Sequence, residues 1–286
     1  MNYKMVGFVL GRIFLIEAVL MLFPMGCAAL YGEWNIILAF LWPALILLAL
    51  GLVTSLRTPK NTKIYARDGL AIVALVWVLM SVFGALPFVI SGEIPSFVDA
   101  LFETVSGFTT TGSTILTDVE ALSHGTLFWR SFSHWIGGMG VLVFAMAVLP
   151  MTDGRAMHLM RAEVPGPTCG KISSKLSDSA KILYAIYLVL TVIEVIMLCA
   201  GGMPLFDSLI HAFGTAGTGG FSNKALSVGA YNSPYFEVVI GVFMLLFGIN
   251  FNLYYLLLLR QWRSVLRSDE LWTYLGLVVV ATGVIT

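Results

Sequence analysis

The sequence predicts an all-α polytopic membrane protein built from parallel repeats of a span, a pore loop and a second span. Three observations support this prediction: the composition, a series of long apolar runs, and a hydroxyl-rich segment that occurs twice. Of the 286 residues, 58% are hydrophobic and 11% are charged, whereas soluble domains carry about 25% charged residues. The composition therefore points to several membrane spans rather than a soluble domain.

Charge, cysteine and histidine patterns exclude several classes of site. The formal net charge is zero, which argues against a nucleic-acid partner. The three cysteines are far apart and have no C-x-x-C spacing, so we expect neither a disulfide framework nor a zinc site. The four histidines, His124, His134, His158 and His211, also lack metal-ligand spacing. We therefore expect no transition-metal site and no covalently bound cofactor.

Seven apolar runs define the expected spans. A helix that crosses the hydrocarbon core needs about 20 apolar residues, and each complete run meets this length. The runs cover 6–30, 34–56, 69–90, 127–149, 180–200, 235–259 and the stretch from 271 to the end of the sequence.

The positions of lysine and arginine predict the orientation. Segments 57–67, 151–181 and 260–267 hold twelve of the sixteen basic residues, and Lys4 and Arg12 add two more on the same side. Cytoplasmic loops of membrane proteins carry an excess of Lys and Arg. We therefore expect a multi-pass protein whose N-terminus is cytoplasmic.

The two connections on the outer side, 91–126 and 201–234, share one pattern. Each opens with a short apolar piece, 94–108 or 203–213, which is too short to cross and fits a re-entrant half-helix. A polar, glycine-broken segment follows. The pattern F-x-T-x-G aligns Phe108 with Phe213, at a spacing of 105 residues, and both copies have the same orientation. Such a repeat indicates the architecture.

The chemistry of these polar segments favours a cation. Non-helical backbone at membrane depth survives only where it is buried in protein or lines a wet cavity. An extended segment of threonine and glycine presents a row of carbonyls that can replace the water shell of a cation. The negative C-terminal end of each half-helix favours the same charge. The residues therefore predict a path for a permeating cation.

At these residues the sequence resembles the TrkH membrane subunits of the Trk/Ktr/HKT superfamily of potassium transporters. The resemblance extends along the whole chain. The segments "SGFTTTGSTIL", "HAFGTAGTGGFSN" and "SFSHWIGGMGVLVFAMAVLP" carry it. It implies a pseudo-fourfold pore formed by four span–pore-loop–span units and preceded by two extra transmembrane helices. It also implies potassium uptake across the bacterial inner membrane, with K⁺ as the transported ion.

The resemblance implies a selectivity filter of backbone carbonyls in each polar segment. Ion binding is assigned to Thr110, Thr111 and Gly112 in the first segment, and to Thr215, Ala216 and Gly217 in the second. The filter would continue through Ser113, Thr114, Thr218 and Gly219. The expected partners are a second copy of the chain, a cytosolic nucleotide-binding regulatory subunit of the TrkA type, and membrane lipid.

The repeat also predicts the division of the chain. We expect a helix pair at 1–56, units at 57–150 and 151–259, and the start of a third unit at 260–286. Two of the family's four filter segments are present. We interpret the chain as an N-terminal part that lacks about 200 residues, and we expect residues 1–286 alone to conduct no potassium.

Several alternatives remain open at this stage. A membrane enzyme would need a catalytic constellation that does not stand out in the sequence, and a secondary transporter would normally show inverted or longer repeats. Glu103 either braces the filter or enriches cations at its mouth, and Arg130 pairs with Glu103 or Asp118. Glu17 and Glu194, which lie inside spans, are structural hydrogen-bonding groups or functional acids. Gly248, Asn250 and Asn252 bond a neighbouring helix or line an inner cavity.

Overall fold

A computed structural model describes residues 2–56, 59, 65–140 and 176–285 of the chain. The described residues form helices and connecting loops, without a strand among them. The helices are α1 (Tyr3–Leu20), α2 (Leu22–Leu30), α3 (Trp34–Ser55), α4 (Ala66–Ser91), α5 (Phe97–Phe108), α6 (His124–Gly138), α9 (Leu176–Ala200), α10 (Leu205–Ala216), η1 (Ser227–Tyr231), α11 (Pro234–Gly248), α12 (Phe251–Leu258), α13 (Trp262–Leu266) and α14 (Asp269–Ile285). The predicted all-α class is confirmed.

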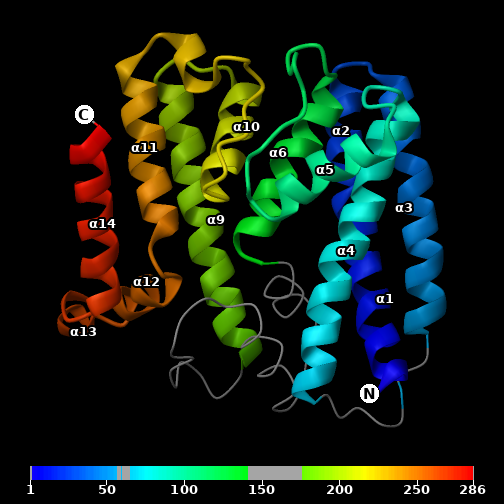
Figure 1. The fold of residues 1–286 in the computed structure, drawn as a ribbon, viewed down its shortest axis with the longest axis horizontal. Helices are drawn as coiled ribbons and strands as arrows, with labels where there is room; N and C mark the ends of the chain where they lie inside the picture. The colour runs from blue at the N-terminus through cyan, green and yellow to red at the C-terminus, as the bar shows by residue number, and fades with distance from the viewer. Residues whose placement is uncertain (1, 57–58, 60–64, 141–175, 286) are drawn as a thin grey trace.

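The long helices run side by side in two halves, with α1 to α6 on one side and α9 to α14 on the other (Figure 1). Four helical stretches are long and apolar enough to cross a membrane, namely Tyr3–Leu30, Trp34–Ser55, Arg67–Ser91 and Lys181–Ala200. They match the runs expected at 6–30, 34–56, 69–90 and 180–200. The run expected at 127–149 is described only in its first part, as α6, and its remainder lies outside the described residues.

The run expected as one span at 235–259 departs from a straight crossing. Helices α11 and α12 meet at an angle of 86° across a short break. Ile249 has extended backbone angles there, and Asn250 has non-helical ones (φ −56°, ψ 118°). The Asn250 side chain accepts a hydrogen bond from the N–H of Asn252 at 3.0 Å. This side chain caps a new helix, so the polar residue, rather than the apolar composition around it, ends the span.

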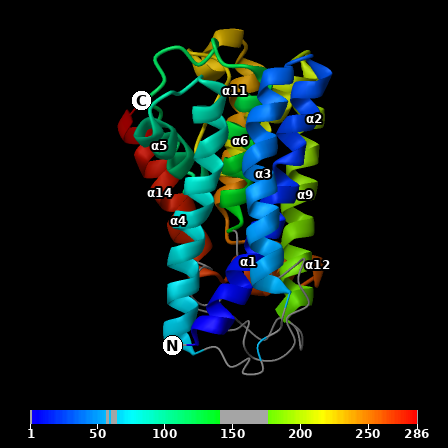
Figure 2. The same cartoon turned by 90° about the vertical axis from the view of Figure 1, so that its right-hand side faces the viewer.

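Two short helices, α5 and α10, lie where the half-helices were expected. Both α5 and α10 contain 12 residues, or about 18 Å of helix, which is less than the hydrocarbon core of about 30 Å. Figure 2 shows α5 beside the upper half of α4 only, whereas α3 and α4 run along most of the molecule. Helix α5 packs against α4 and α6, and α10 packs against α6, α9 and α11. Each half-helix is therefore held between longer helices.

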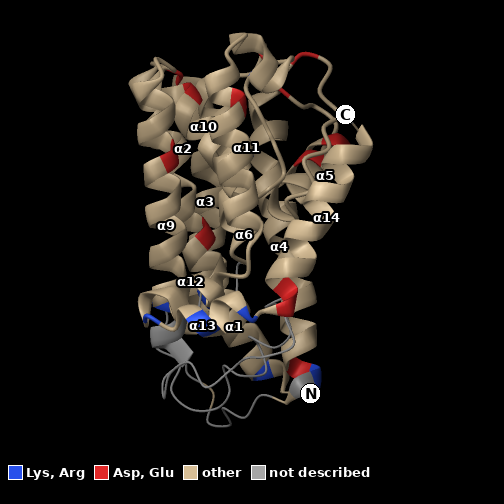
Figure 3. Cartoon of the chain, turned by 90° about the vertical axis from the view of Figure 1, so that its left-hand side faces the viewer, with Lys and Arg blue, Asp and Glu red and all other residues tan. Residues whose placement is uncertain are grey.

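Charges are distributed unequally along the helices. In Figure 3 the lysines and arginines that can be seen gather at the end that holds the N-terminus and α13, while acidic residues also lie at the opposite end. The end with the N-terminus is therefore the basic end of the described structure.

The connection between α2 and α3 anchors the N-terminal helix pair to both half-helix units. The Glu33 carboxylate accepts hydrogen bonds from the backbone N–H groups of His124 at 2.8 Å and Gly125 at 3.0 Å, and it lies 2.9 Å from Nδ1 of the His124 ring. The Tyr31 ring stacks on the His124 ring with a centroid separation of 3.7 Å, and Phe206 of α10 contacts both rings edge-on. A carboxylate at the first turn of α6 also complements the helix dipole.

We expect Glu33→Gln to lower the free energy of unfolding by about 1–2 kcal/mol. The glutamine amide has only one acceptor oxygen and no charge, so it cannot accept all of the hydrogen bonds that the Glu33 carboxylate accepts. Thermal unfolding in detergent would measure the loss. Glu237→Gln is the matched control, since Glu237 lies in the first turn of α11 on an exposed surface. Equal unfolding temperatures for both variants would contradict the anchoring role of Glu33.

Candidate ion pathway

The polar segments after α5 and α10 leave their helices with the same backbone geometry. Thr110 and Thr218 both have a φ of 55°, and two positions later Gly112 and Gly220 have φ values of 75° and 80°. The N–H of Thr110 bonds the carbonyl of Gly107 at 3.0 Å, and the N–H of Thr218 bonds the carbonyl of Thr215 at 2.8 Å. Each half-helix therefore ends in a left-handed residue that turns the chain out of the helix.

These matched positions are 108 residues apart, so the spacing of 105 predicted from the F-x-T-x-G pattern is wrong. The structural partner of Phe108 is Ala216, because α5 ends at Phe108 while α10 continues three residues beyond Phe213. The segment 109–112 therefore corresponds to 217–220.

The corrected register moves the second half of the predicted site. Thr215 and Ala216 lie in the last turn of α10, and Gly217 is its C-cap. All three are buried, and the Thr215 hydroxyl donates to the His211 carbonyl at 2.8 Å. By contrast, Thr218 and Gly220 are exposed and match Thr110 and Gly112. The first predicted set, Thr110, Thr111 and Gly112, keeps its place in the loop after α5.

The two loops approach each other closely through glycine backbone. A Cβ atom added to Gly112 would lie 1.9 Å from the carbonyl oxygen of Gly219. A Cβ atom added to Gly219 would lie 2.8 Å from the carbonyl oxygen of Thr110. Such distances leave no room for a side chain, so the loops of the two units meet backbone to backbone beside the exposed threonines.

Each loop is braced from behind by the seventh residue of its own half-helix. In the first unit, the Thr114 hydroxyl donates to the Glu103 carboxylate, with distances of 2.9 and 3.0 Å to its two oxygens. In the second unit, the Ser222 hydroxyl bonds Nε2 of His211 at 3.0 Å. Nδ1 of His211 lies 2.8 Å from the Asp207 carbonyl, which only accepts, so Nε2 is the acceptor for Ser222. Glu103 and His211 are again 108 residues apart.

Arg130 of α6 connects the two braces. Its Nε atom donates to the Glu103 carboxylate at 2.5 Å, and a terminal guanidinium nitrogen donates to the Ser222 carbonyl at 2.9 Å. The structure thus selects Glu103, rather than Asp118, as the acidic partner of Arg130. Neither Phe221 nor Ser222 was among the predicted residues. The first-turn aspartates, Asp99 and Asp207, which are also 108 positions apart, were the sequence signal that could have found the correct register.

An outer layer of polar contacts surrounds the second loop. The Asp207 carboxylate accepts hydrogen bonds from the Asn223 amide at 2.6 Å and the Tyr231 hydroxyl at 2.7 Å. Lys224 pairs with Glu120 of the first unit at 3.3 Å. The pKa of the Glu120 carboxyl is lowered, mainly by the hydrogen bond from the backbone N–H of Ala225 and to a smaller extent by the one from the Lys224 ammonium. This exposed pair also joins the outer loops of the two units.

The other acids considered from the sequence lie away from the loop surfaces. Glu17 of α1 and Glu194 of α9 are fully buried, and within the described residues neither carboxyl makes a hydrogen bond of good geometry. The Thr215 hydroxyl lies beside Glu194 but donates to the His211 carbonyl instead. His158 lies outside the described residues, which contain no group of three metal-ligating side chains.

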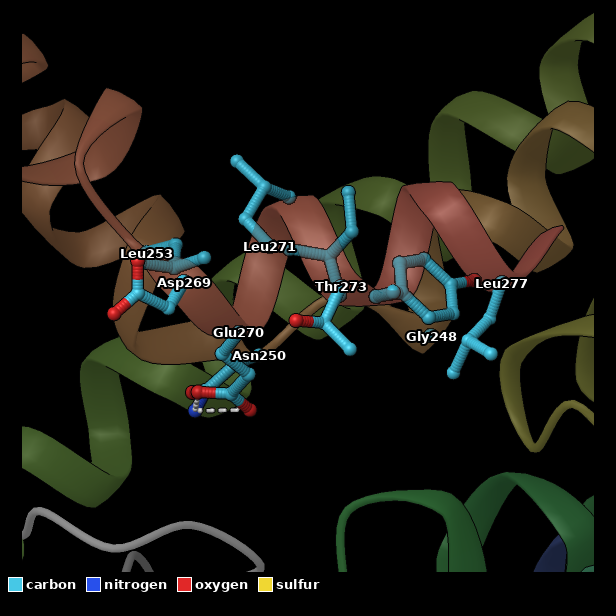
Figure 4. A pocket seen from close by; sticks show the side chains of 10 residues that line it. Gly248, Asn250, Leu253, Asp269, Glu270, Leu271, Thr273 and Leu277 are labelled. Carbon is cyan, nitrogen blue, oxygen red and sulfur yellow. Dashed lines mark hydrogen bonds between the residues drawn. The ribbon is translucent and has the colours of Figure 1, made fainter. Parts of the chain in front are cut away.

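A separate cavity of about 440 Å³ lies at the break between α11 and α12. Figure 4 shows that residues of α14, among them Glu270, Thr273 and Leu277, line it together with Asn250. The Asn250 amide donates to the Glu270 carboxylate at 3.1 and 3.2 Å. Asn250 therefore bonds a neighbouring helix, which is one of the two alternatives considered from the sequence, and it also lines this separate cavity.

Comparison with known proteins identifies similar chains. A family model described as TrkH, cation transport protein, matches residues 37–279. The Trk system potassium uptake protein TrkH of Salmonella typhimurium is 36% identical over 294 residues, covering 100% of this chain and 60% of that protein. The Trk system potassium uptake protein TrkG of Escherichia coli K12 is 36% identical over 288 residues, covering 99% and 59%.

The fold also matches a solved structure. The crystal structure of the potassium transporter TrkH from Vibrio parahaemolyticus superposes with a TM-score of 0.75 at 31% sequence identity, covering 89% of this chain and 52% of that one. The chain thus spans about 60% of the length of the curated relatives that it matches first.

Proposed function

The chain belongs to the TrkH family of cation transport proteins, and from this premise we propose that it forms pore walls for potassium uptake across the bacterial inner membrane. One observation carries the proposal: two half-helices end in the same left-handed turn, and the loops that follow meet backbone to backbone at Gly112 and Gly219. Loops of this kind at membrane depth need a wet cavity or an ion to satisfy their carbonyls.

In the proposed pathway, the carbonyls of the two corrected loop segments contact the ion. These segments are Thr110, Thr111 and Gly112 in the first unit, and Thr218, Gly219 and Gly220 in the second. Ser113 and Thr114 continue the first segment outward. The C-terminal ends of α5 and α10 point their partial negative charge at the same region, which favours a cation over an anion.

The proposal also covers the orientation of the chain, its division into units and its partners. The basic end of the structure, with the N-terminus, faces the cytoplasm. We place the helix pair at 1–56, the two pore units at 57–150 and 151–259, and the start of a third unit at 260–286. The family relation favours a homodimer in membrane lipid and a cytosolic nucleotide-binding subunit of the TrkA type as partners.

Uptake of rubidium, a tracer for potassium, tests the function. The chain, joined to any residues that follow Thr286 in its gene, is expressed in cells that lack potassium uptake and is also purified into proteoliposomes. We expect growth on low potassium and a rubidium influx that potassium suppresses more strongly than sodium does. Absence of influx from well-folded protein in both assays would contradict the proposal.

A further inference from the structure

The pair Glu103–Arg130 lies buried behind both loops. The two side chains are 0% and 3% exposed. Glu103 accepts from Arg130, from the Thr114 hydroxyl and from the backbone N–H of Ile115 at 3.1 Å. The guanidinium of Arg130 donates to the Ser222 carbonyl and lies 3.6 Å from the centroid of the Phe221 ring. Each partner therefore holds the loop of a different unit.

Burying this ion pair carries a desolvation free energy that only good geometry and further hydrogen bonds can offset. Removing two charges from water costs several kcal/mol per ion, and an apolar pair of similar volume is often at least as stable. Here the carboxylate has hydrogen-bond donors on both oxygens, and the guanidinium has a carboxylate, a carbonyl and an aromatic face. These directional contacts fix the positions of the two loops more closely than a non-directional hydrophobic contact would.

The matched register shows what is fixed. Thr114 and Ser222 occupy equivalent positions, 108 residues apart, and each bonds the brace residue of its own half-helix. The backbone N–H of Leu116 bonds the Thr114 hydroxyl, and that of Lys224 bonds the Ser222 hydroxyl. Arg130 joins these two otherwise separate braces. The buried ion pair therefore links the loop of one unit to the loop of the other.

We propose that Glu103 and Arg130 form a positioning pair that sets the separation of the two loops and thereby the discrimination between potassium and sodium. This inference rests on the proposed function. Carbonyl sites distinguish the larger from the smaller ion through the number and spacing of their oxygens. Loops held in fixed positions keep their carbonyl oxygens at the spacing that suits the larger ion, whereas loosened loops let the oxygens adjust to the smaller one.

Two conservative variants test the pair. In Arg130→Lys, the compact ammonium lacks the planar fork of donors that arginine has, so it cannot reach both the Glu103 carboxylate and the Ser222 carbonyl. In Glu103→Gln, the amide keeps the shape but loses the charge. We expect each variant to keep a maximal rubidium influx within about twofold of the original protein. The potassium-over-sodium ratio in competition should fall about tenfold, the effect of one charge-assisted hydrogen bond.

The matched controls are Lys224→Gln and Glu120→Gln. These residues also join the outer loops of the two units, but their side chains are 33% and 47% exposed, and exposed pairs contribute little. We expect the controls to keep the original ion ratio. An unchanged ratio in both folded variants of the buried pair, or an equal change in the controls, would overturn the positioning role.

Hydrogen exchange gives a readout that does not depend on transport. In Arg130→Lys, the amide hydrogens of 217–224 should exchange faster than in the original protein, although this loop belongs to the other unit; in Lys224→Gln they should not. If the original protein takes up no rubidium, the proposed function fails, and the exchange result alone then decides on the positioning pair. Unchanged exchange in Arg130→Lys would overturn it.

Discussion

Replacing Gly112 with alanine is expected to lower the apparent affinity for potassium on the order of 100-fold and to reduce its preference over sodium. The new Cβ atom would lie 1.9 Å from the Gly219 carbonyl oxygen, so the backbone of the opposite loop must move. Displacing a packed group costs about 1–3 kcal/mol. The φ of 75° adds about 1 kcal/mol for a residue with a side chain, and together these terms give the expected factor.

A second glycine separates the two causes. Gly92 has nearly the same φ, 79°, but no atom lies within 4 Å of an added Cβ. Gly92→Ala therefore carries the backbone strain without the contact between the loops. Concentration series of rubidium influx, with potassium and sodium as competitors, measure both variants. A normal influx and ion preference in Gly112→Ala, or an equal loss in Gly92→Ala, would refute the assignment of Gly112 to the ion pathway.

The difference between the predicted spacing of 105 residues and the observed one of 108 shows that the motif did not predict where each half-helix ends. The F-x-T-x-G motif aligned Phe108 with Phe213 by residue type. A helix, however, ends where its backbone hydrogen bonds end, and this position does not follow from residue type alone. Phe213 is buried and contacts the rings of Phe128, Phe132 and Trp135, and α10 continues for three residues beyond it. Residue identities at the end of the half-helix were therefore a weaker guide than the first-turn aspartates at its start.

Other features depended on contacts that are distant in the sequence. The spans followed directly from apolar length, because a membrane helix satisfies its own backbone. The break at Asn250 did not, since an apolar run on both sides conceals a capping side chain that also bonds Glu270 of another helix. The contact of Arg130 with Ser222 joins residues 92 positions apart, and a single sequence does not reveal such pairs.

Two adjacent glycines at the end of α6, Gly137 and Gly138, pack closely against other backbone in the structure. A Cβ atom on Gly137 would lie 2.0 Å from the carbonyl oxygen of Phe108, and one on Gly138 would lie 3.0 Å from that of Ala216. Phe108 and Ala216 are the last residues of the two half-helices. The end of α6 therefore fits between the two half-helix ends, and each glycine admits one of them.

Gly137→Ala is expected to lower the free energy of unfolding by about 2–3 kcal/mol, because neither the α6 backbone nor the end of α5 can move without disturbing the first loop. Gly138→Ala should cost less, since its nearest contact at 2.5 Å is the hydroxyl of Tyr187, the far end of a side chain. Gly241→Ala in α11 is the control: the added Cβ meets open space, and alanine favours a helix by up to about 1 kcal/mol. Unfolding midpoints in detergent should therefore rank Gly241→Ala highest and Gly137→Ala lowest. If Gly137→Ala unfolds no earlier than Gly241→Ala, α6 does not separate the half-helix ends by direct backbone contact.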